Sequence, residues 1–171
     1  PVNAAYEFLN IAQNIIQNKY KSEILWLSWR SRLTDIAEEY TKFEETWRKR
    51  AAINQTEEKI SCFLNDLDFT LEARVDRIDQ LKLCGNAVID YKSGGQYTKS
   101  KIETGALAQL PLEALIQKQN NKNTSYLGYW KITGGKNPIE IIALDDEAKI
   151  LEAVETASHG LRNLINVFSD T

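Results

Sequence analysis

Apolar and polar residues alternate through the middle of the chain. Apolar side chains fall on every second position over residues 60–64 and again over 69–75. The side chains between them are polar or charged throughout 69–75, and in 60–64 with the exception of Phe63. A period of two is typical of strands that bury one face. Turn-forming residues lie at 66–68 and at 82–86, and a third predicted strand follows at 87–92, where three apolar residues precede Asp-Tyr-Lys. The pattern therefore predicts an antiparallel meander of three strands.

Helical spacing predicts the elements around this meander. A first helix covers about residues 8–16, and a longer one about 22–50 carries Trp26, Trp29 and Trp47 on one apolar stripe. We expect these tryptophans to pack in a core or against another subunit. The later elements are a helix at 102–118, strands at 125–133 and 139–144, and a last helix from Asp145 or Asp146 to about 168. The order predicts an α/β fold, a mixed sheet flanked by helices. We divide a single domain 1–171 into a helical part (1–55) and a core (56–171).

Composition narrows the class of protein. The 171 residues are 43% hydrophobic and 26% charged, which is ordinary for a globular domain. No apolar run is long enough to cross a bilayer and no signal peptide opens the chain, so we expect a cytoplasmic protein without a membrane partner. Methionine is absent, which suggests a piece of a longer polypeptide. Cys62 and Cys84 are too few for a disulfide or zinc framework, and we expect two buried, reduced thiols.

The candidate chemistry lies where the second and third strands meet. Asp90 and Lys92 are two apart and share one face of a strand. If the hairpin turns near residue 83, Asp76 lies directly across from Asp90. Two carboxylates this close favour a hard divalent cation such as Mg²⁺ between them, with Lys92 beside it. Such a group suits phosphodiester hydrolysis. A solvated strand face with a simple Asp–Lys pair is the alternative reading.

Three motifs in order resemble those of the PD-(D/E)XK nuclease superfamily, and within it the nuclease domains of the RecB and AddB type. Residues 73–76 (Ala-Arg-Val-Asp) resemble the Gly-x-x-Asp of that family, with Ala in place of Gly. Residues 90–92 match its Asp-Tyr-Lys, and residues 109–113 (Gln-Leu-Pro-Leu-Glu) resemble its Gln-Leu-x-x-Tyr. The runs 69–79 and 109–115 look most like the alphaproteobacterial AddB type.

The resemblance implies a restriction-endonuclease-like core and a nuclease that uses Mg²⁺, or Mn²⁺ as its substitute. It implies that Asp76 and Asp90 bind the metal, that Lys92 is the catalytic lysine, and that Gln109 steadies the site or contacts the DNA backbone. It also implies double-strand break repair beside an AddA-type helicase–nuclease subunit. The alternative is a non-catalytic scaffold of the same fold that binds DNA or the helicase subunit.

Other residues extend or limit this picture. Tyr97, Lys99 and Lys101 follow two glycines in a basic segment, which we interpret as a mobile loop that contacts DNA phosphates. Two cysteines cannot hold an iron–sulfur cluster, so we expect none in this chain. His159 is the only histidine and is expected on the surface of the last helix. A CRISPR-associated exonuclease is a further alternative, although that class usually carries four cluster cysteines.

Overall fold

The computed structural model describes residues 4–169. The chain divides into two compact units. One unit takes in the chain up to Lys49 together with Lys131–Glu140, and the other takes in Arg50–Trp130 and the chain from Ile141. The proposed chemistry lies in the second unit.

The first unit contains a helical hairpin. Its elements are α1 (Ala4–Ile15), the π-helical turn η1 (Ile16–Tyr20) and α2 (Glu23–Arg48). The hydroxyl of Ser22 accepts a hydrogen bond from the backbone N–H of Leu25, which caps the first turn of α2. Trp26 and Trp47 are buried as expected, but Trp29 is 47% exposed, so the apolar stripe is only partly covered.

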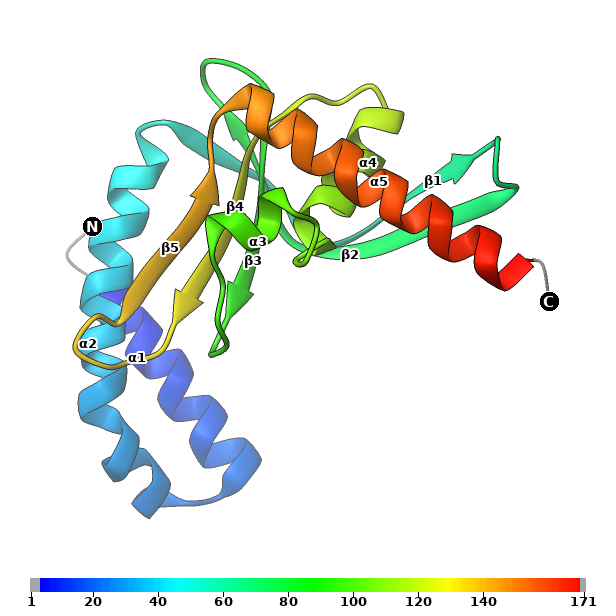
Figure 1. The fold of residues 1–171 in the computed structure, drawn as a ribbon. Coiled ribbons are helices and arrows are strands. Elements are labelled where there is room, and N and C mark those ends of the chain that lie inside the picture. Colours follow the sequence, from blue (N-terminus) through cyan, green and yellow to red (C-terminus); the bar gives the residue numbers. More distant parts are fainter. Residues whose placement is uncertain (1–3, 170–171) are drawn as a thin grey trace. The chain divides into compact units, whose positions relative to one another are not determined.

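A five-stranded sheet lies mainly in the second unit. Its strands are β1 (Ala51–Leu64), β2 (Phe69–Leu81), β3 (Asn86–Lys92), β4 (Thr124–Ile132) and β5 (Ile139–Leu144), in the spatial order β1-β2-β3-β4-β5. The pairs β1–β2 and β2–β3 are antiparallel. The arrowheads of β3 and β4 point the same way in Figure 1, so the sheet is mixed. The predicted meander and mixed sheet are confirmed.

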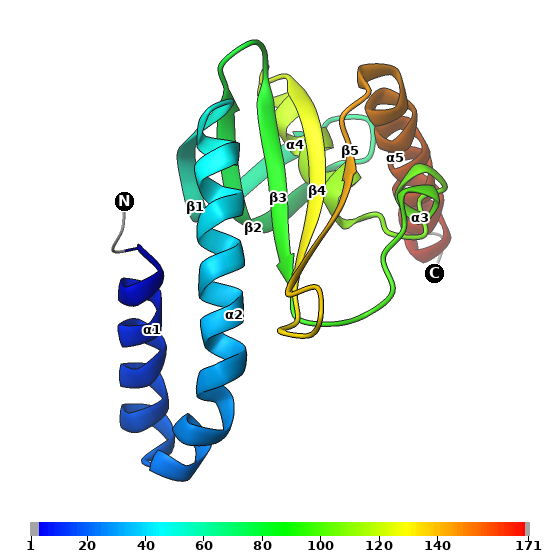
Figure 2. The ribbon, with the colours of Figure 1, turned by 90° about the vertical axis from the view of Figure 1, so that its left-hand side faces the viewer.

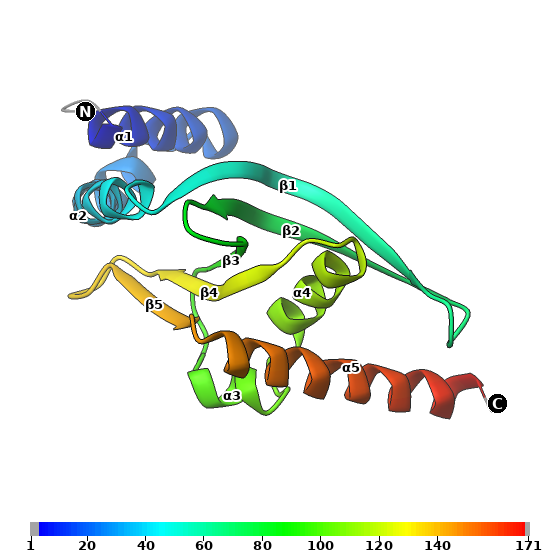
Figure 3. The same cartoon turned by 90° about the horizontal axis from the view of Figure 1, so that it is seen from above.

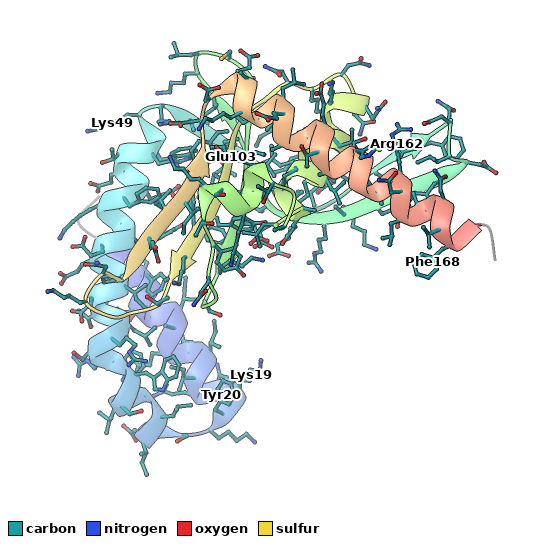
Figure 4. All side chains as sticks on the ribbon, in the orientation of Figure 1. Lys19, Tyr20, Lys49, Glu103, Arg162 and Phe168 are labelled. Carbon is teal, nitrogen blue, oxygen red and sulfur yellow. The ribbon has the colours of Figure 1, made fainter. Side chains whose placement is uncertain are left out.

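Three helices cover one face of this sheet, as Figures 2 and 3 show. They are α3 (Lys99–Glu103), α4 (Gln109–Gln119) and α5 (Glu147–Ser169). Buried side chains of all three, among them Ile102, Leu110 and Val154, join the strand residues Val88 and Leu127 in one core. Arg162 of α5, which is labelled in Figure 4, also forms an ion pair with Asp66 in the β1–β2 turn. This layer fixes α4, which carries Gln109, against the sheet.

The predicted helix over 102–118 is wrong because the chain breaks within it. The segment forms α3 and α4, separated by residues 104–108. Gly105 adopts φ +76°, a left-handed conformation that ends a helix and that glycine adopts without strain. The helical spacing of apolar residues continues across the break through Leu107 and Leu110, so the sequence pattern did not reveal the break.

Two further expectations need correction. The helical part ends at Arg48 rather than at 55, because β1 already begins at Ala51. Residues 52–59 of β1 are mostly exposed on both faces, so no apolar alternation marked them as a strand. Cys62 is buried as expected, but Cys84 is exposed in the β2–β3 turn. His159 lies exposed on α5, as predicted.

Among residues 4–169, no helix is both long enough and apolar enough to cross a bilayer.

Candidate active site

The register of the β2–β3 hairpin brings two carboxylates together. Its pairs run from Gln80 with Asn86 to Arg77 with Ile89, so the next pair in register is Asp76 with Asp90. The backbone N–H of Tyr91 donates to Asp76 Oδ2 over 2.8 Å, which ties the Asp76 side chain to β3. This register is the one predicted from a turn near residue 83. Asp76 is half-buried and Asp90 is 3% exposed.

Lys92 lies beside the second carboxylate, one strand repeat further along β3. Its Nζ is 2.6 Å from Asp90 Oδ2, and its side chain remains 24% exposed. The ammonium also faces two aromatic rings, 5.9 Å from the ring centre of Tyr97 and 5.6 Å from that of Tyr129. Cation–π contact with two rings restrains a long side chain that would otherwise be mobile. Lys92 is thus held on one side of Asp90 and still reaches solvent.

Gly95 makes room for the two aromatic rings of Tyr97 and Tyr129. Gly95 adopts φ +93°, and a Cβ placed on it would lie 2.7 Å from Cε2 of Tyr97. Both the backbone conformation and the space therefore exclude a side chain here. The close approach lets Tyr97 pack against Tyr129, with ring centres 4.7 Å apart.

Gln109 at the start of α4 connects the charged groups. Its Nε2 donates to Asp90 Oδ1 over 2.6 Å, and its Oε1 accepts from Lys92 Nζ over 3.1 Å. The helix break after α3 places this residue at the first position of α4, where its side chain reaches the end of β3. The structure therefore brings together Asp76, Asp90, Lys92 and Gln109.

Glu113 is a further member of this cluster, and it is not among the site residues predicted from the sequence. Its Oε1 accepts from Gln109 Nε2 over 3.1 Å, and its side chain is 2% exposed. Residues four apart on a helix lie on one face, so the spacing from Gln109 was the available signal. In the motif of residues 109–113, Glu113 stands where the family pattern has Tyr.

The pKa directions follow from burial and from these contacts. Burial raises the pKa of Asp90 and the nearby Asp76 charge adds to it, although Lys92 and Gln109 act in the opposite direction. Burial lowers the pKa of Lys92, but the hydrogen bond and charge of Asp90 outweigh it and the net pKa is raised. Burial raises the pKa of Glu113 to about 7, partly offset by the Gln109 hydrogen bond. Lys92 is therefore an ammonium at neutral pH.

The opposite face of the same strands holds a separate buried ion pair. Arg77 donates to both oxygens of Asp79, with Nε 2.8 Å from Oδ1 and Nη2 2.5 Å from Oδ2. Arg77 also donates to the hydroxyl of Tyr91 and lies over the ring of Trp130. Asp79 is thus turned away from Asp76, because residues three apart on a strand lie on opposite faces of the sheet.

Lys99 and Lys101 do not lie in a mobile loop. Both belong to the short helix α3, and the Thr98 hydroxyl accepts from the backbone N–H of Lys101 to cap it. Both side chains are exposed, and Lys101 Nζ donates to the carbonyl of Gln96. Thr98 is a residue type that commonly begins a helix, so its position before Lys99 was a sequence signal for α3. The basic composition of the segment favoured a loop instead.

The donor set of the cluster suits a hard cation. Asp76 and Asp90 face each other with carboxylate oxygens, the ligand type that Mg²⁺ prefers while it keeps several waters. Over the described part of the chain, no group of three or more His, Cys, Asp or Glu side chains is arranged as metal ligands. A site of two carboxylates completed by water and substrate fits this arrangement, and a cation held wholly by protein ligands does not.

Comparison with known proteins assigns the family. The model of the PD-(D/E)XK nuclease superfamily matches residues 2–170. The chain belongs to the PD-(D/E)XK nuclease superfamily. Enzymes of this superfamily generally use divalent metal ions such as Mg²⁺.

This PD-(D/E)XK domain is similar in sequence to a longer protein and in fold to a solved structure. It is 29% identical over 140 residues to an uncharacterized protein of Rickettsia bellii (strain RML369-C), covering 80% of this chain but only 17% of that protein. A crystal structure of a candidate exonuclease from Eubacterium rectale superposes with a TM-score of 0.51 at 14% identity, covering 94% of this chain and 66% of the other. The second likeness confirms the restriction-endonuclease-like fold.

Proposed function

We propose that this PD-(D/E)XK domain is a metal-dependent deoxyribonuclease that hydrolyses phosphodiesters of one strand of unwound DNA. The observation that carries the proposal is the cluster of Asp76, Asp90 and Lys92 on one face of the β2–β3 hairpin. Membership of a nuclease superfamily supports the reaction class. A scaffold has no chemical need for two carboxylates and a lysine held together in a partly buried site.

The residues have separate roles in the proposed reaction. Asp76 and Asp90 would hold Mg²⁺, or Mn²⁺ as its substitute, and the bound ion would activate water and polarise the phosphoryl oxygen. Lys92 carries an ammonium that donates to the phosphate oxygens as negative charge builds on them. Gln109 holds Asp90 and Lys92 at fixed positions through its amide.

Cleavage of end-labelled single-stranded DNA tests the activity. The wild-type chain is assayed with Mg²⁺, with Mn²⁺ and with EDTA, beside Asp90→Ala and Lys92→Ala. Lys82→Ala is the matched control, because Lys82 is exposed in the turn of the same hairpin, about 20 Å from the site at about 3.3 Å per residue. We expect metal-dependent cleavage that both site variants abolish and the control keeps.

Two outcomes of this assay would contradict the proposal. A well-folded wild-type chain that binds DNA but does not cut it with either metal would refute the nuclease and leave the non-catalytic scaffold. Cleavage that survives Lys92→Ala would mean that the lysine is not part of the chemistry.

We further propose that Lys99 and Lys101 contact DNA phosphates. Both side chains are exposed on α3. This helix directly follows the loop that contains Tyr97, whose ring contacts the Lys92 ammonium. Each lost phosphate contact lowers the dependence of binding on salt by about one counterion. Lys99→Ala with Lys101→Ala is therefore expected to weaken binding of single-stranded DNA and to flatten its salt dependence. An unchanged salt dependence would refute the contact.

We also propose that the domain is of the AddB type and acts beside an AddA-type helicase–nuclease subunit in recombination and break repair, in the cytoplasm of a bacterium. The resemblance of residues 69–79 and 109–115 supports this assignment, and the Rickettsia bellii relative is several times longer than this chain. The test is joint purification of the parent polypeptide with such a subunit. Cleavage of double-stranded DNA by that complex should require ATP, and cleavage without ATP would contradict the assignment.

A further inference from the structure

Glu113 is a buried carboxyl group for which the proposed chemistry has no role. Its side chain is 2% exposed, and its single hydrogen bond within the described chain is the one that Oε1 accepts from Gln109. The second oxygen, Oε2, is buried without a hydrogen-bond partner there. Burying a carboxyl group with so few partners is costly, so the position calls for an explanation.

Both polar atoms of the Gln109 amide are hydrogen-bonded, and the partners favour one orientation of the amide. Its Nε2 lies 2.6 Å from Asp90 Oδ1 and 3.1 Å from Glu113 Oε1, so each of its two protons has an acceptor. Its Oε1 accepts from Lys92. A flipped amide would aim its carbonyl oxygen at two carboxyl groups and its NH₂ group at an ammonium. Asp90 and Glu113 together therefore decide which way the amide points.

We propose that Glu113 is a positioning residue, which orients the Gln109 amide so that its carbonyl holds Lys92 and its NH₂ group holds Asp90. The inference rests on the proposed nuclease function and adds a residue to it. The proposed orienting effect of Glu113 passes through Gln109, because the one hydrogen bond that Glu113 makes within the cluster is with that amide. An oxygen at Oε1 accepts whether or not the carboxyl group carries a proton, so orientation does not depend on its charge.

Two substitutions of similar size separate this role from charge and from packing. Glu113→Gln keeps an acceptor oxygen at the same reach, whereas Glu113→Leu keeps most of the volume and removes the acceptor. We expect Glu113→Leu to lower kcat for single-stranded DNA by about 10- to 100-fold, the usual effect of losing a group that orients a site residue, with little change in KM. Glu113→Gln should recover most of that loss.

Two outcomes of this comparison would overturn the inference. If Glu113→Gln is as impaired as Glu113→Leu, the charge of the group is what matters. If Glu113→Leu is as active as the wild type, the contact has no role. Urea unfolding of both variants establishes that each is folded under the assay conditions.

A double-mutant cycle tests whether Glu113 acts through Gln109. If it does, adding Glu113→Leu to Gln109→Ala costs nothing beyond Gln109→Ala alone. If the two losses multiply, Glu113 supports the site by another route and the inference is wrong.

The side-chain amide resonances of Gln109 give a readout that needs no activity. In the wild type both protons of Nε2 are hydrogen-bonded, and Glu113→Leu should shift one of them toward its free position while Glu113→Gln should not. A wild-type chain that does not cut DNA refutes the proposed function, and the amide resonances still show whether Glu113 orients Gln109. Unchanged resonances in Glu113→Leu overturn the orientation itself.

Discussion

The burial of Glu113 predicts a pH-dependent loss of stability that one substitution removes. Burial raises the pKa of this carboxyl group from 4.5 to about 7 in the folded chain. The folded chain therefore keeps a proton that the unfolded chain releases, and folding becomes less favourable as pH rises. The stabilising effect is fully present below pH 4.5 and is lost as pH rises through about 7.

The size of the effect follows from the two pKa values. One unit of pKa difference between the folded and unfolded chain is worth about 1.4 kcal/mol. By pH 8 the free energy of unfolding of the wild type is therefore lower by about 3 kcal/mol than it would be with a neutral side chain at this position. Glu113→Gln carries no proton to lose. Between pH 4.5 and pH 8 the free energy of unfolding of the wild type should fall by about 3 kcal/mol more than that of Glu113→Gln.

Urea unfolding at a series of pH values, with EDTA present, measures this difference. EDTA keeps cations away from the neighbouring carboxylates, whose charge contributes to the pKa of Glu113. Glu155→Gln is the matched control, because it removes the same charge from an exposed position on α5. Parallel pH profiles for the wild type and Glu113→Gln would show that Glu113 is ionised in the folded chain, and would refute the argument from burial.

Three further substitutions test the energetics of the fold by urea unfolding. Asp79→Ala leaves the buried Arg77 guanidinium without its bidentate partner and should cost about 3–5 kcal/mol; a cost below 1 kcal/mol would contradict the buried pair. Asp66→Ala removes the partner of Arg162 in a half-exposed pair and should cost less than about 1 kcal/mol, so a cost as large as that of Asp79→Ala would contradict the distinction. Gly105→Ala forces a side chain to adopt φ +76° and should cost about 1–2 kcal/mol, whereas a gain in stability would show that α3 and α4 can join.

The sequence predicts the β2–β3 hairpin because local rules determine it. Alternation assigns the faces of β2, and the turn residues set the register by counting outward from residue 83. The opposition of Asp76 and Asp90 follows from these two facts alone. The Asp90–Lys92 contact follows from the period of a strand, which needs no tertiary information.

The features that the sequence did not predict depend on tertiary structure. The break at Gly105 is compatible with the same apolar spacing as a continuous helix, because α3 and α4 bury residues in one core. The exposed half of β1 has no apolar alternation, since its pairing with β2 rather than burial holds it as a strand. The four-residue spacing places Glu113 on the same helix face as Gln109, but only the helix break, which sets Gln109 at the start of α4 beside Asp90, brings that face to the site.

Four consecutive residues of β2 supply two different environments. Asp76 faces Asp90 and the partly open cluster with Lys92, where a side chain remains accessible to solvent. Arg77 and Asp79 lie on the other face, where the guanidinium meets both carboxylate oxygens and both side chains are at most 3% exposed. A buried ion pair whose oxygens both accept hydrogen bonds holds the strand in place, and it leaves no accessible oxygen that a substrate could reach. The sheet thus separates two carboxylates that are three residues apart. Asp76→Ala should abolish cleavage and cost in stability only the hydrogen bond from the Tyr91 N–H, whereas Asp79→Ala should act through stability alone.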